Sequence, residues 1–217
     1  MASKSTKSPK SPKSPKSTGG AFAILGALLV ALGLGLGIRY AFLDKGPIEP
    51  LKIEVKIGGP FDLVDHNGRT VTDETYRGRY LLVYFGYIYC PDVCPTGLQT
   101  ITEALNKLGD KAQAVQPIFV SVDPERDTVA QMAAYVKSFH PSLIGLTGAP
   151  EQVMATARAY RVYYAKVKKE GAAPNEYLVD HSAVIYLMGP DGRYIQHFSH
   201  SVEAEEMARA LERHIDK

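Results

Sequence analysis

The chain contains only two cysteines, Cys90 and Cys94, which lie in the sequence Tyr89-Cys90-Pro91-Asp92-Val93-Cys94-Pro95. A disulfide between them would close so short a loop that its stabilisation would fall at the bottom of the usual range of about 0–5 kcal/mol. We therefore interpret the pair as chemically active rather than structural. Two such thiols either cycle between dithiol and disulfide or bind a soft metal ion.

The elements that must position this pair alternate between strands and helices. The apolar run 80–87 predicts a central strand before the cysteines, and leucine and isoleucine at helical spacing predict a helix after them. Further predicted elements are a strand at 61–64 with a hairpin at Asn67-Gly68, a strand at 115–122, a helix opened by a capping box at 128–131, a strand at 143–146, a helix at 150–160, a hairpin at 183–188 and 193–198, and a helix at 202–215. This order predicts an α/β, thioredoxin-like fold.

In that fold the thiol motif lies where a central strand is followed by a helix. Pro95 suits the first helical position, which puts Cys94 at about the N-cap. Because a helix N-terminus favours negative charge, both thiols are expected to ionise more readily than a free cysteine. We also expect both thiols to lie at a surface junction outside the apolar core.

The spacing differs from that of a thioredoxin, because three residues rather than two separate the cysteines. A thioredoxin also places a cis-proline opposite its thiols, whereas here the matching stretch contains His181, beside Asp180 and just before a buried strand. Two thiolates and one imidazole at one point would form a site suited to Cu(I) and tolerable for Cu(II) or zinc. Asp180 is interpreted as a group that orients His181 or recognises a partner, with direct copper binding as the less favoured alternative.

Several blocks of the sequence resemble the Sco (SenC) copper chaperones of cytochrome c oxidase assembly. The resemblance covers about residues 58–215 and is carried by Tyr84-Phe-Gly-Tyr87 with Cys90-Pro-Asp-Val-Cys-Pro95, by Val122-Asp-Pro-Glu-Arg-Asp-Thr128, by Gly145-Leu-Thr-Gly148, by Ala159-Tyr-Arg-Val-Tyr-Tyr164, and by Val179-Asp-His-Ser182 with Gly189-Pro-Asp-Gly192. It implies that Cys90, Cys94 and His181 bind copper and that the copper goes to the binuclear centre of oxidase subunit II. The sequence departs from the family at Tyr87-Ile88-Tyr89, where relatives more often have Phe-Thr-His.

Three classes of function remain open. The first is a copper metallochaperone, with another copper donor and a thiol reductant as further partners. The second is a thiol–disulfide reductase, in which Cys90 and Cys94 are the redox-active groups and keep the cysteines of subunit II reduced. The third, a thiol peroxidase, is disfavoured because 83–89 has no proline or hydroxyl residue at the positions that such enzymes use to activate peroxide.

A membrane anchor is predicted before the exported domain. Residues 21–38 contain no charge, and the apolar segment extends to Leu43, close to the roughly 20 residues that span a bilayer. Five lysines and no acidic residue precede it, which predicts a cytoplasmic N-terminus and an exported C-terminal domain. A cleaved signal peptide is the less favoured alternative, because its apolar region is usually shorter. The predicted organisation is a basic disordered tail at 1–20, an anchor at 21–43, a linker at 44–60 and the copper-binding domain at 61–217.

The charge distribution bears on partners and compartment. The chain has 25 basic and 23 acidic residues; 1–45 hold seven and one of these, so the remainder carries 18 and 22, a net charge of −4. A mildly acidic domain has no polyanion-binding character, so no nucleic-acid partner is predicted. The lysine-rich tail lacks the arginine-rich pattern of a transit peptide, which favours the bacterial inner membrane and periplasm over the mitochondrial inner membrane facing the intermembrane space.

Other polar residues receive structural interpretations. Asp123-Pro124-Glu125-Arg126-Asp127 is interpreted as a turn, with partner docking as the alternative. His197 and His200 are interpreted as surface histidines rather than a second metal site, because their spacing on a strand end would direct them to opposite faces. Tyr163 and Tyr164 are expected to pack in the core.

Overall fold

The computed structural model describes residues 19–42, 56–168, 170–171, 173 and 176–216. Contacts divide the chain into two units, one containing the N-terminal helix and the other beginning at Val55. The predicted tail at 1–20 falls almost wholly outside the described residues, as does most of the linker predicted at 44–60.

The first unit contains one described helix, α1, Gly19–Phe42. Its segment Ala23–Ala41 is long and apolar enough to cross a membrane, with a mean hydropathy of 1.9. The leucine, isoleucine and valine side chains of this segment are exposed. This agrees with the span predicted at 21–43, of which Leu43 lies outside the described residues.

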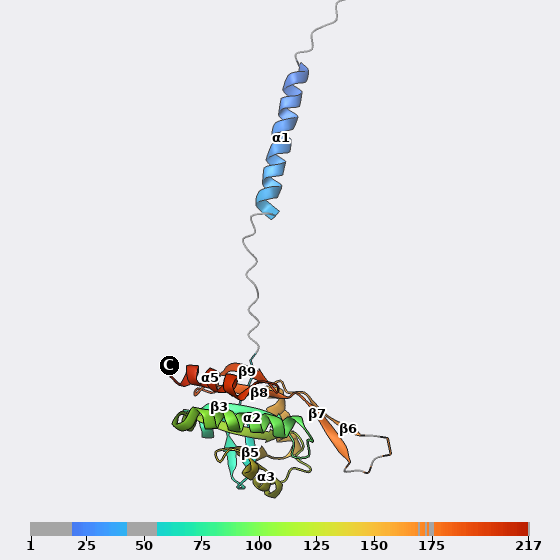
Figure 1. The fold of residues 1–217 in the computed structure, drawn as a ribbon. Helices are drawn as coiled ribbons and strands as arrows, with labels where there is room; N and C mark the ends of the chain where they lie inside the picture. The colour runs from blue at the N-terminus through green and yellow to red at the C-terminus, as the bar shows by residue number, and fades with distance from the viewer. Residues whose placement is uncertain (1–18, 43–55, 169, 172, 174–175, 217) are drawn as a thin grey trace, which may run out of the picture. The chain divides into compact units, whose positions relative to one another are not determined.

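The second unit is built on a seven-stranded sheet (Figure 1) with the strand order β2-β1-β5-β4-β3-β8-β9. The three central strands are parallel to one another, and β8 and β9 continue the sheet in antiparallel pairing beside β3. The strands of this sheet are β1 (Asp62–Asp65), β2 (Thr70–Thr72), β3 (Tyr80–Gly86), β4 (Val115–Ser121), β5 (Ile144–Thr147), β8 (Val184–Met188) and β9 (Tyr194–Ser199).

Helices cover this sheet and complete the core. The helix that follows the cysteine motif, α2, packs against the last helix, α5, while α3 packs against β5 and α4 against β1. The helices are α2 (Val93–Leu108), α3 (Val129–Tyr135), α4 (Pro150–Ala159) and α5 (Ala204–Ile215), with 3₁₀ turns η1 (Asp73–Tyr76), η2 (Gly109–Ala114) and η3 (Val136–Ser138). The apolar run predicted as a central strand is β3, and six of its seven residues are buried, as expected for a strand covered on both faces.

Local sequence signals account for several element boundaries. Thr128 is the N-cap of α3, and the capping box with Gln131 is present as predicted. The hairpin predicted at Asn67-Gly68 joins β1 to β2, and Gly68 adopts a φ of +82°, a conformation that favours glycine.

One element was not predicted from the sequence. Strands β6 (Tyr164–Lys168) and β7 (Tyr177–His181) pair with each other in a separate two-stranded antiparallel sheet. This β6–β7 hairpin projects away from the seven-stranded sheet, as Figure 1 shows. His181 is therefore the last residue of a hairpin strand that precedes β8, rather than a residue that simply enters the buried strand.

Candidate metal centre

The two cysteines lie where β3 leads into α2, and both are buried. Cys94 is fully buried and Cys90 is 9% exposed, so the prediction that both thiols lie outside the apolar core is wrong. The reason is the close approach of Cys94 to the end of β3. A Cβ atom built on Gly86 would lie 2.6 Å from Cys94 Sγ, so a glycine at this position leaves the space that the thiol occupies.

Helix α2 begins earlier than the sequence predicted. Its first residue is Val93 and its N-cap is Asp92, so Cys94 is the second helical residue and not the N-cap. The Asp92 carbonyl accepts the N–H of Thr96 at 3.2 Å, which closes the first turn before Pro95 can act as the first helical residue. Cys94 therefore projects from the first turn of the helix toward the buried side.

His181 completes the group from the opposite side. Its Nε2 atom lies 3.3 Å from Cys94 Sγ, and its Nδ1 lies 3.1 Å from the carbonyl oxygen of Val179. A proton on Nδ1 donated to this carbonyl leaves the lone pair of Nε2 directed at the thiol. The buried Tyr87 ring packs edge-on against the imidazole at a centroid distance of 5.7 Å.

The two thiols differ in acidity. The hydrogen bond from Cys94 lowers the pKa of Cys90 to about 5, helped by the backbone N–H groups of Asp92 and Cys94 and by His181, and opposed by burial. The same hydrogen bond and deep burial raise the pKa of Cys94 far above that of a free thiol. The expectation that both thiols ionise readily is therefore correct for Cys90 and wrong for Cys94.

These donors fit a soft metal ion by type. Two sulfur atoms and one imidazole nitrogen form the S₂N set that suits Cu(I) and also accommodates Cu(II) or zinc. In the part of the chain that the structure describes, no three histidine, cysteine or acidic side chains already stand at metal-binding distances. The three donors would therefore have to move closer to one another to surround an ion.

Several other predicted residues lie elsewhere. Asp180 is exposed, on the face of β7 that faces away from His181, whose Nδ1 pairs with the Val179 carbonyl instead. The prediction that Asp180 orients His181 is therefore wrong. His197 and His200 are exposed, as predicted. Tyr163 is 65% exposed, whereas Tyr164 is partly buried against the core, so the packing prediction is wrong for Tyr163 and confirmed for Tyr164.

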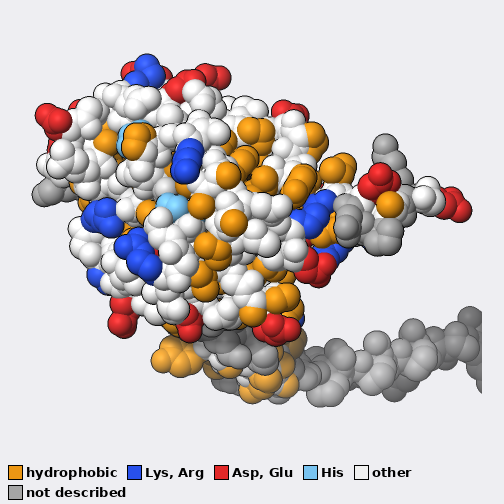
Figure 2. Space-filling model, turned by 90° about the horizontal axis from the view of Figure 1, so that it is seen from below, with side chains coloured by type: hydrophobic (Ala, Val, Ile, Leu, Met, Phe, Trp, Pro, Cys, Tyr) orange, Lys and Arg blue, Asp and Glu red, His pale blue; other side chains and the backbone are white. Residues whose placement is uncertain are grey.

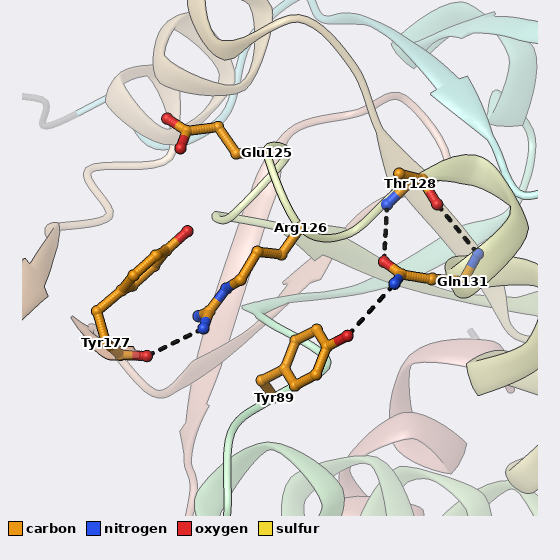
Figure 3. A pocket seen from close by; sticks show the side chains of 6 residues that line it. All are labelled: Tyr89, Glu125, Arg126, Thr128, Gln131 and Tyr177. Carbon is orange, nitrogen blue, oxygen red and sulfur yellow. Dashed lines mark hydrogen bonds between the residues drawn. The ribbon is translucent and has the colours of Figure 1, made fainter. Parts of the chain in front are cut away.

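Sequence reasoning missed the residues that surround the motif from the loop after β4. A pocket of about 510 Å³, shown in Figure 3, is lined by Tyr89, Glu125, Arg126, Thr128, Gln131 and Tyr177. Its Arg126 side chain lies between the rings of Tyr177 and Tyr89, with its guanidinium carbon 3.7 Å and 5.0 Å from the two centroids. A signal existed in the sequence, because Asp123 closely follows a buried strand parallel to β3, and parallel strands end at the same edge of a sheet.

The residues Tyr87-Ile88-Tyr89, where the sequence departs from the family, make three different kinds of contact. Tyr87 contacts His181, whereas Tyr89 is 52% exposed and its hydroxyl accepts the side-chain amide of Gln131 at 3.3 Å. Between them, Ile88 donates its backbone N–H to Asp127 Oδ2 at 3.1 Å. One residue of this segment therefore packs against the imidazole, one binds the loop after β4, and one lines the pocket.

Comparisons with known proteins agree with the residue pattern. A family model described as SCO1/SenC matches residues 51–216. The mitochondrial SCO1 homolog 1 of Arabidopsis thaliana is 41% identical over 201 residues, which cover 87% of this chain and 59% of that protein. An SCO2-like protein of Rickettsia prowazekii is 37% identical over 188 residues, which cover 83% of this chain and 91% of that protein.

Solved structures agree as well. The copper-bound structure of Bradyrhizobium japonicum ScoI is 47% identical and has a TM-score of 0.68, covering 73% of this chain and 99% of that one. The copper-bound Arabidopsis thaliana ScoI is 42% identical with the same TM-score, covering 74% of this chain and 98% of that one. The prediction of a mixed α/β, thioredoxin-like domain is confirmed by these likenesses.

Proposed function

Because the chain belongs to the SCO1/SenC family, we propose that it is a membrane-anchored copper metallochaperone that acts in cytochrome c oxidase assembly. The copper-bound structures of relatives at 47% and 42% identity support copper as the cargo. The observation that carries the proposal is the approach of His181 Nε2 to within 3.3 Å of Cys94 Sγ, in a chain whose only cysteines are Cys90 and Cys94. The recipient that we propose is the binuclear copper site of oxidase subunit II.

Cys90, Cys94 and His181 are the proposed ligands. Cys90 is ionised at neutral pH, since the pKa of its thiol is lowered to about 5. Cys94 must lose its proton when the metal binds, because a thiolate is the ligand form. His181 Nε2 faces that thiol and is free to bind the ion once Nδ1 donates to the Val179 carbonyl.

Transfer then follows from ligand exchange. Thiolates of the recipient replace Cys90 and Cys94 one at a time, so the copper ion never has to leave a protein ligand for water. A burial difference between the two thiols orders this exchange, because Cys90 is 9% exposed and Cys94 is fully buried. We propose that Cys90 is exchanged first. Oxidation of the pair would remove both thiolates, so a copper donor and a thiol reductant are the further proposed partners.

A thiol–disulfide reductase acting on the cysteines of subunit II is the second candidate, and the low pKa of Cys90 favours it. The Cys90 thiolate attacks a partner disulfide, forming a mixed disulfide and releasing one partner thiolate, which takes a proton. Cys94 then gives its proton to His181 Nε2 and attacks Cys90 Sγ, forming the Cys90–Cys94 disulfide and releasing the second partner thiolate, which takes that proton from His181. The partner gains two electrons and the pair loses two.

The proposed domain organisation places this chemistry outside the cytoplasm. The apolar helix serves as an uncleaved anchor over 21–43, followed by a linker at 44–60 and the copper-binding domain at 61–217. Five lysines and no acidic residue precede the helix, which supports a cytoplasmic N-terminus. We propose the bacterial periplasm as the compartment, with the mitochondrial intermembrane space as the alternative.

The test compares wild type with His181→Ala, Cys90→Ala and Cys94→Ala, with His200→Ala as a matched control on an exposed histidine. Each protein is reduced, loaded with Cu(I) or Cu(II), and mixed with the apo form of the subunit II domain. We expect one copper per wild-type chain, and only when the thiols are reduced. Either cysteine variant should lose tight Cu(I) binding. His181→Ala should keep part of its Cu(I) affinity but lose the thiolate-to-Cu(II) charge-transfer band and the transfer of copper.

The same proteins distinguish the two candidates. In the reductase mechanism the first step needs only Cys90, so His181→Ala should still form the mixed disulfide at the wild-type rate. If His181→Ala transfers copper normally but does not reduce disulfides, the reductase becomes the first candidate. Copper binding by the oxidised protein at the same stoichiometry would contradict the ligand assignment.

A further inference from the structure

His181, the histidine of the proposed metal centre, lies on a strand that is not part of the main sheet. His181 ends β7, which pairs only with β6 and not with the seven-stranded sheet. An isolated two-stranded hairpin is marginally stable in water, so its position must come from contacts with the body of the domain. Tyr177 and Val179 are the buried side chains of β7, and they alternate with exposed Leu178 and Asp180.

Tyr177, at the other end of β7 from His181, carries the strongest of these contacts. Its hydroxyl donates to Asp123 Oδ1 at 2.8 Å, and its backbone carbonyl accepts Arg126 Nη1 at 3.1 Å. The guanidinium of Arg126 also stacks over the Tyr177 ring at 3.7 Å, and its Nε pairs with Asp123 Oδ2. Figure 3 shows the Arg126 guanidinium directed at Tyr177, with the hydrogen bond to its carbonyl drawn.

These contacts are buried, so the loss of any one of them is costly in free energy. Asp123 is fully buried, and the Arg126 side chain is 15% exposed. A buried carboxylate that loses a hydrogen-bond partner pays a desolvation penalty, so the group is held strongly in one arrangement. By contrast, the ion pair between Lys166 of β6 and Glu125 is solvent-exposed and contributes little. Figure 2 shows basic and acidic side chains side by side where the hairpin leaves the body.

The same loop also holds the cysteine side of the centre. Asp127 accepts the backbone N–H of Ile88 at 3.1 Å and the hydroxyl of Ser121 at 2.7 Å. Ile88 lies two residues before Cys90. The backbone N–H groups of Arg126 and Asp127 in turn donate to the Asp123 carbonyl, at 3.1 Å and 2.9 Å, so the loop is closed on itself. One short loop therefore binds both the segment that carries Cys90 and the strand that carries His181.

We infer that the loop 123–127 sets the distance between Cys90 and His181, and that Asp123, Arg126 and Tyr177 are positioning residues for the imidazole. This inference rests on the proposed copper-binding function. It assigns a positioning role to a segment that the sequence predicted as a turn, with partner docking as the alternative. Asp127 positions the cysteine side through Ile88, and Asp123 with Arg126 positions the histidine side through Tyr177.

The test weakens the contacts that Tyr177 makes with Asp123 and Arg126. Tyr177→Phe deletes the hydroxyl bound to Asp123 and keeps the ring under Arg126, whereas Arg126→Lys keeps a positive charge but loses the stacking and the bond to the Tyr177 carbonyl. Tyr163→Phe is the matched control, since it deletes an exposed hydroxyl beside β6 in the same hairpin. The full-length chain in detergent micelles is used throughout, first without metal and then with Cu(I) or Cu(II).

Two readouts are needed. In the apo protein, hydrogen exchange measured by mass spectrometry should become faster in peptides covering 177–181 while those covering β3 and β4 stay protected. After loading, the Cu(II) affinity should fall by about 10–100-fold, the range typical for residues that orient metal ligands, and the charge-transfer band should shift. The Cu(I) affinity should fall less, because the two thiolates dominate it. Tyr163→Phe should match wild type in both readouts.

The outcomes separate this inference from the proposed function. Unchanged exchange at 177–181 in both Tyr177→Phe and Arg126→Lys would overturn the inference, whatever the copper result. Faster exchange with unchanged Cu(II) affinity and spectrum would overturn it as well, because these contacts would then hold the hairpin without affecting the metal centre. If wild type itself binds copper independently of His181, the proposed ligand set fails, and the apo exchange data still decide whether the loop holds the hairpin.

Discussion

Cys90 and Cys94 are chemically different because their surroundings differ, although each lies in the same short motif. Cys90 accepts a hydrogen bond from Cys94 and from backbone N–H groups, which lowers the pKa of its thiol to about 5. Cys94 donates that bond from a fully buried position. The pair therefore loses its first proton easily and its second only when a metal or a base takes it. In the proposed reductase mechanism, Cys90 would therefore be the nucleophile and Cys94 the group that acts second.

This difference predicts a pH profile for alkylation of the reduced, metal-free protein. Iodoacetamide reacts with thiolates, so its rate at Cys90 should be constant from pH 6 to 8 and fall as the pH drops through about 5. In Cys94→Ala the midpoint should move upward, because the hydrogen bond that favours the Cys90 thiolate is lost. Peptide mapping by mass spectrometry gives the rate at Cys90. A wild-type midpoint near pH 8.5, as for a free cysteine, would contradict the prediction.

Gly86 controls the space beside the buried thiol. A Cβ atom at this position would lie 2.6 Å from Cys94 Sγ and 2.7 Å from the Phe119 ring, both closer than atoms pack. Gly86→Ala should therefore lower the free energy of unfolding by about 1–3 kcal/mol, the usual cost of overpacking, and weaken Cu(I) binding by displacing the thiol. Urea unfolding and copper titration measure the two effects. Gly59→Ala is the control, since its Cβ would make an ordinary 3.5 Å contact.

At the level of elements, the domain positions its reactive groups with three segments that meet at one edge of the sheet. The end of β3 brings Cys90 and Cys94, β7 brings His181, and the loop after β4 contacts both. Because β3 and β4 are parallel neighbours, their carboxyl ends lie side by side, which is where ligand sites form in α/β sheets.

Asp127 in this loop gives the domain a pH-dependent stability. Burial raises the pKa of its carboxyl to about 6, and its Oδ1 atom has no described hydrogen-bond partner. The folded state therefore holds the proton more tightly than the unfolded state, whose pKa is about 3.9. Stability should fall as the pH rises from about 4 to 6 and then change no further, by about 2–3 kcal/mol for this group.

The variant Asp127→Asn isolates that contribution. Its amide oxygen can still accept the N–H of Ile88, so we expect the domain to fold and the stability change between pH 4 and 6 to become smaller. Denaturant unfolding at several pH values measures it. Glu151→Gln, at an exposed acid on α4, should leave the wild-type slope in this range almost unchanged. An identical slope in Asp127→Asn and wild type would show that other groups control the pH dependence.

At the scale of the whole molecule, the described residues form one apolar helix and one α/β domain. Ala23–Ala41 meets the length and hydropathy of a membrane span, and the buried core of the second unit lies wholly within 61–211. The net charge of −4 after residue 45 is mild, so the lysines before the helix dominate the charge asymmetry on which the proposed topology rests.

This asymmetry predicts topology. Alkaline phosphatase fused after Lys217 should be active in a bacterial host, because the enzyme folds only on the exported side, and the fusion should resist extraction from membranes by alkaline carbonate. Replacing the five N-terminal lysines by glutamine should lower the phosphatase activity by weakening the orientation signal. Release of the fusion by carbonate would instead indicate cleavage or a peripheral association.

The sequence by itself indicated the candidate reactive groups and predicted the order of most elements and the apolar helix. These features are local: residue types define the chemistry, and periodicities of two and 3.6 residues define strands and helices. The blocks around Cys90, Cys94 and His181 were also sufficient to indicate the family, which the match over 51–216 confirms.

The tertiary structure alone decided how these groups are arranged and what surrounds them. Three features depend on contacts between distant segments, such as the contact between Cys94 and His181, which lie 87 positions apart. These features are the burial of Cys94, the different acidity of the two thiols, and the position of Asp180 away from the imidazole. The β6–β7 hairpin was missed because its strands are short and partly exposed and so carry no buried apolar run. The sequence of the loop 123–127 predicted mainly a turn, because the partners of its side chains lie far away in the sequence. Its carboxylates acquire partners only when Tyr177 and Ile88 are brought beside it, and hydrogen bonding and desolvation are properties of that packing rather than of the local sequence.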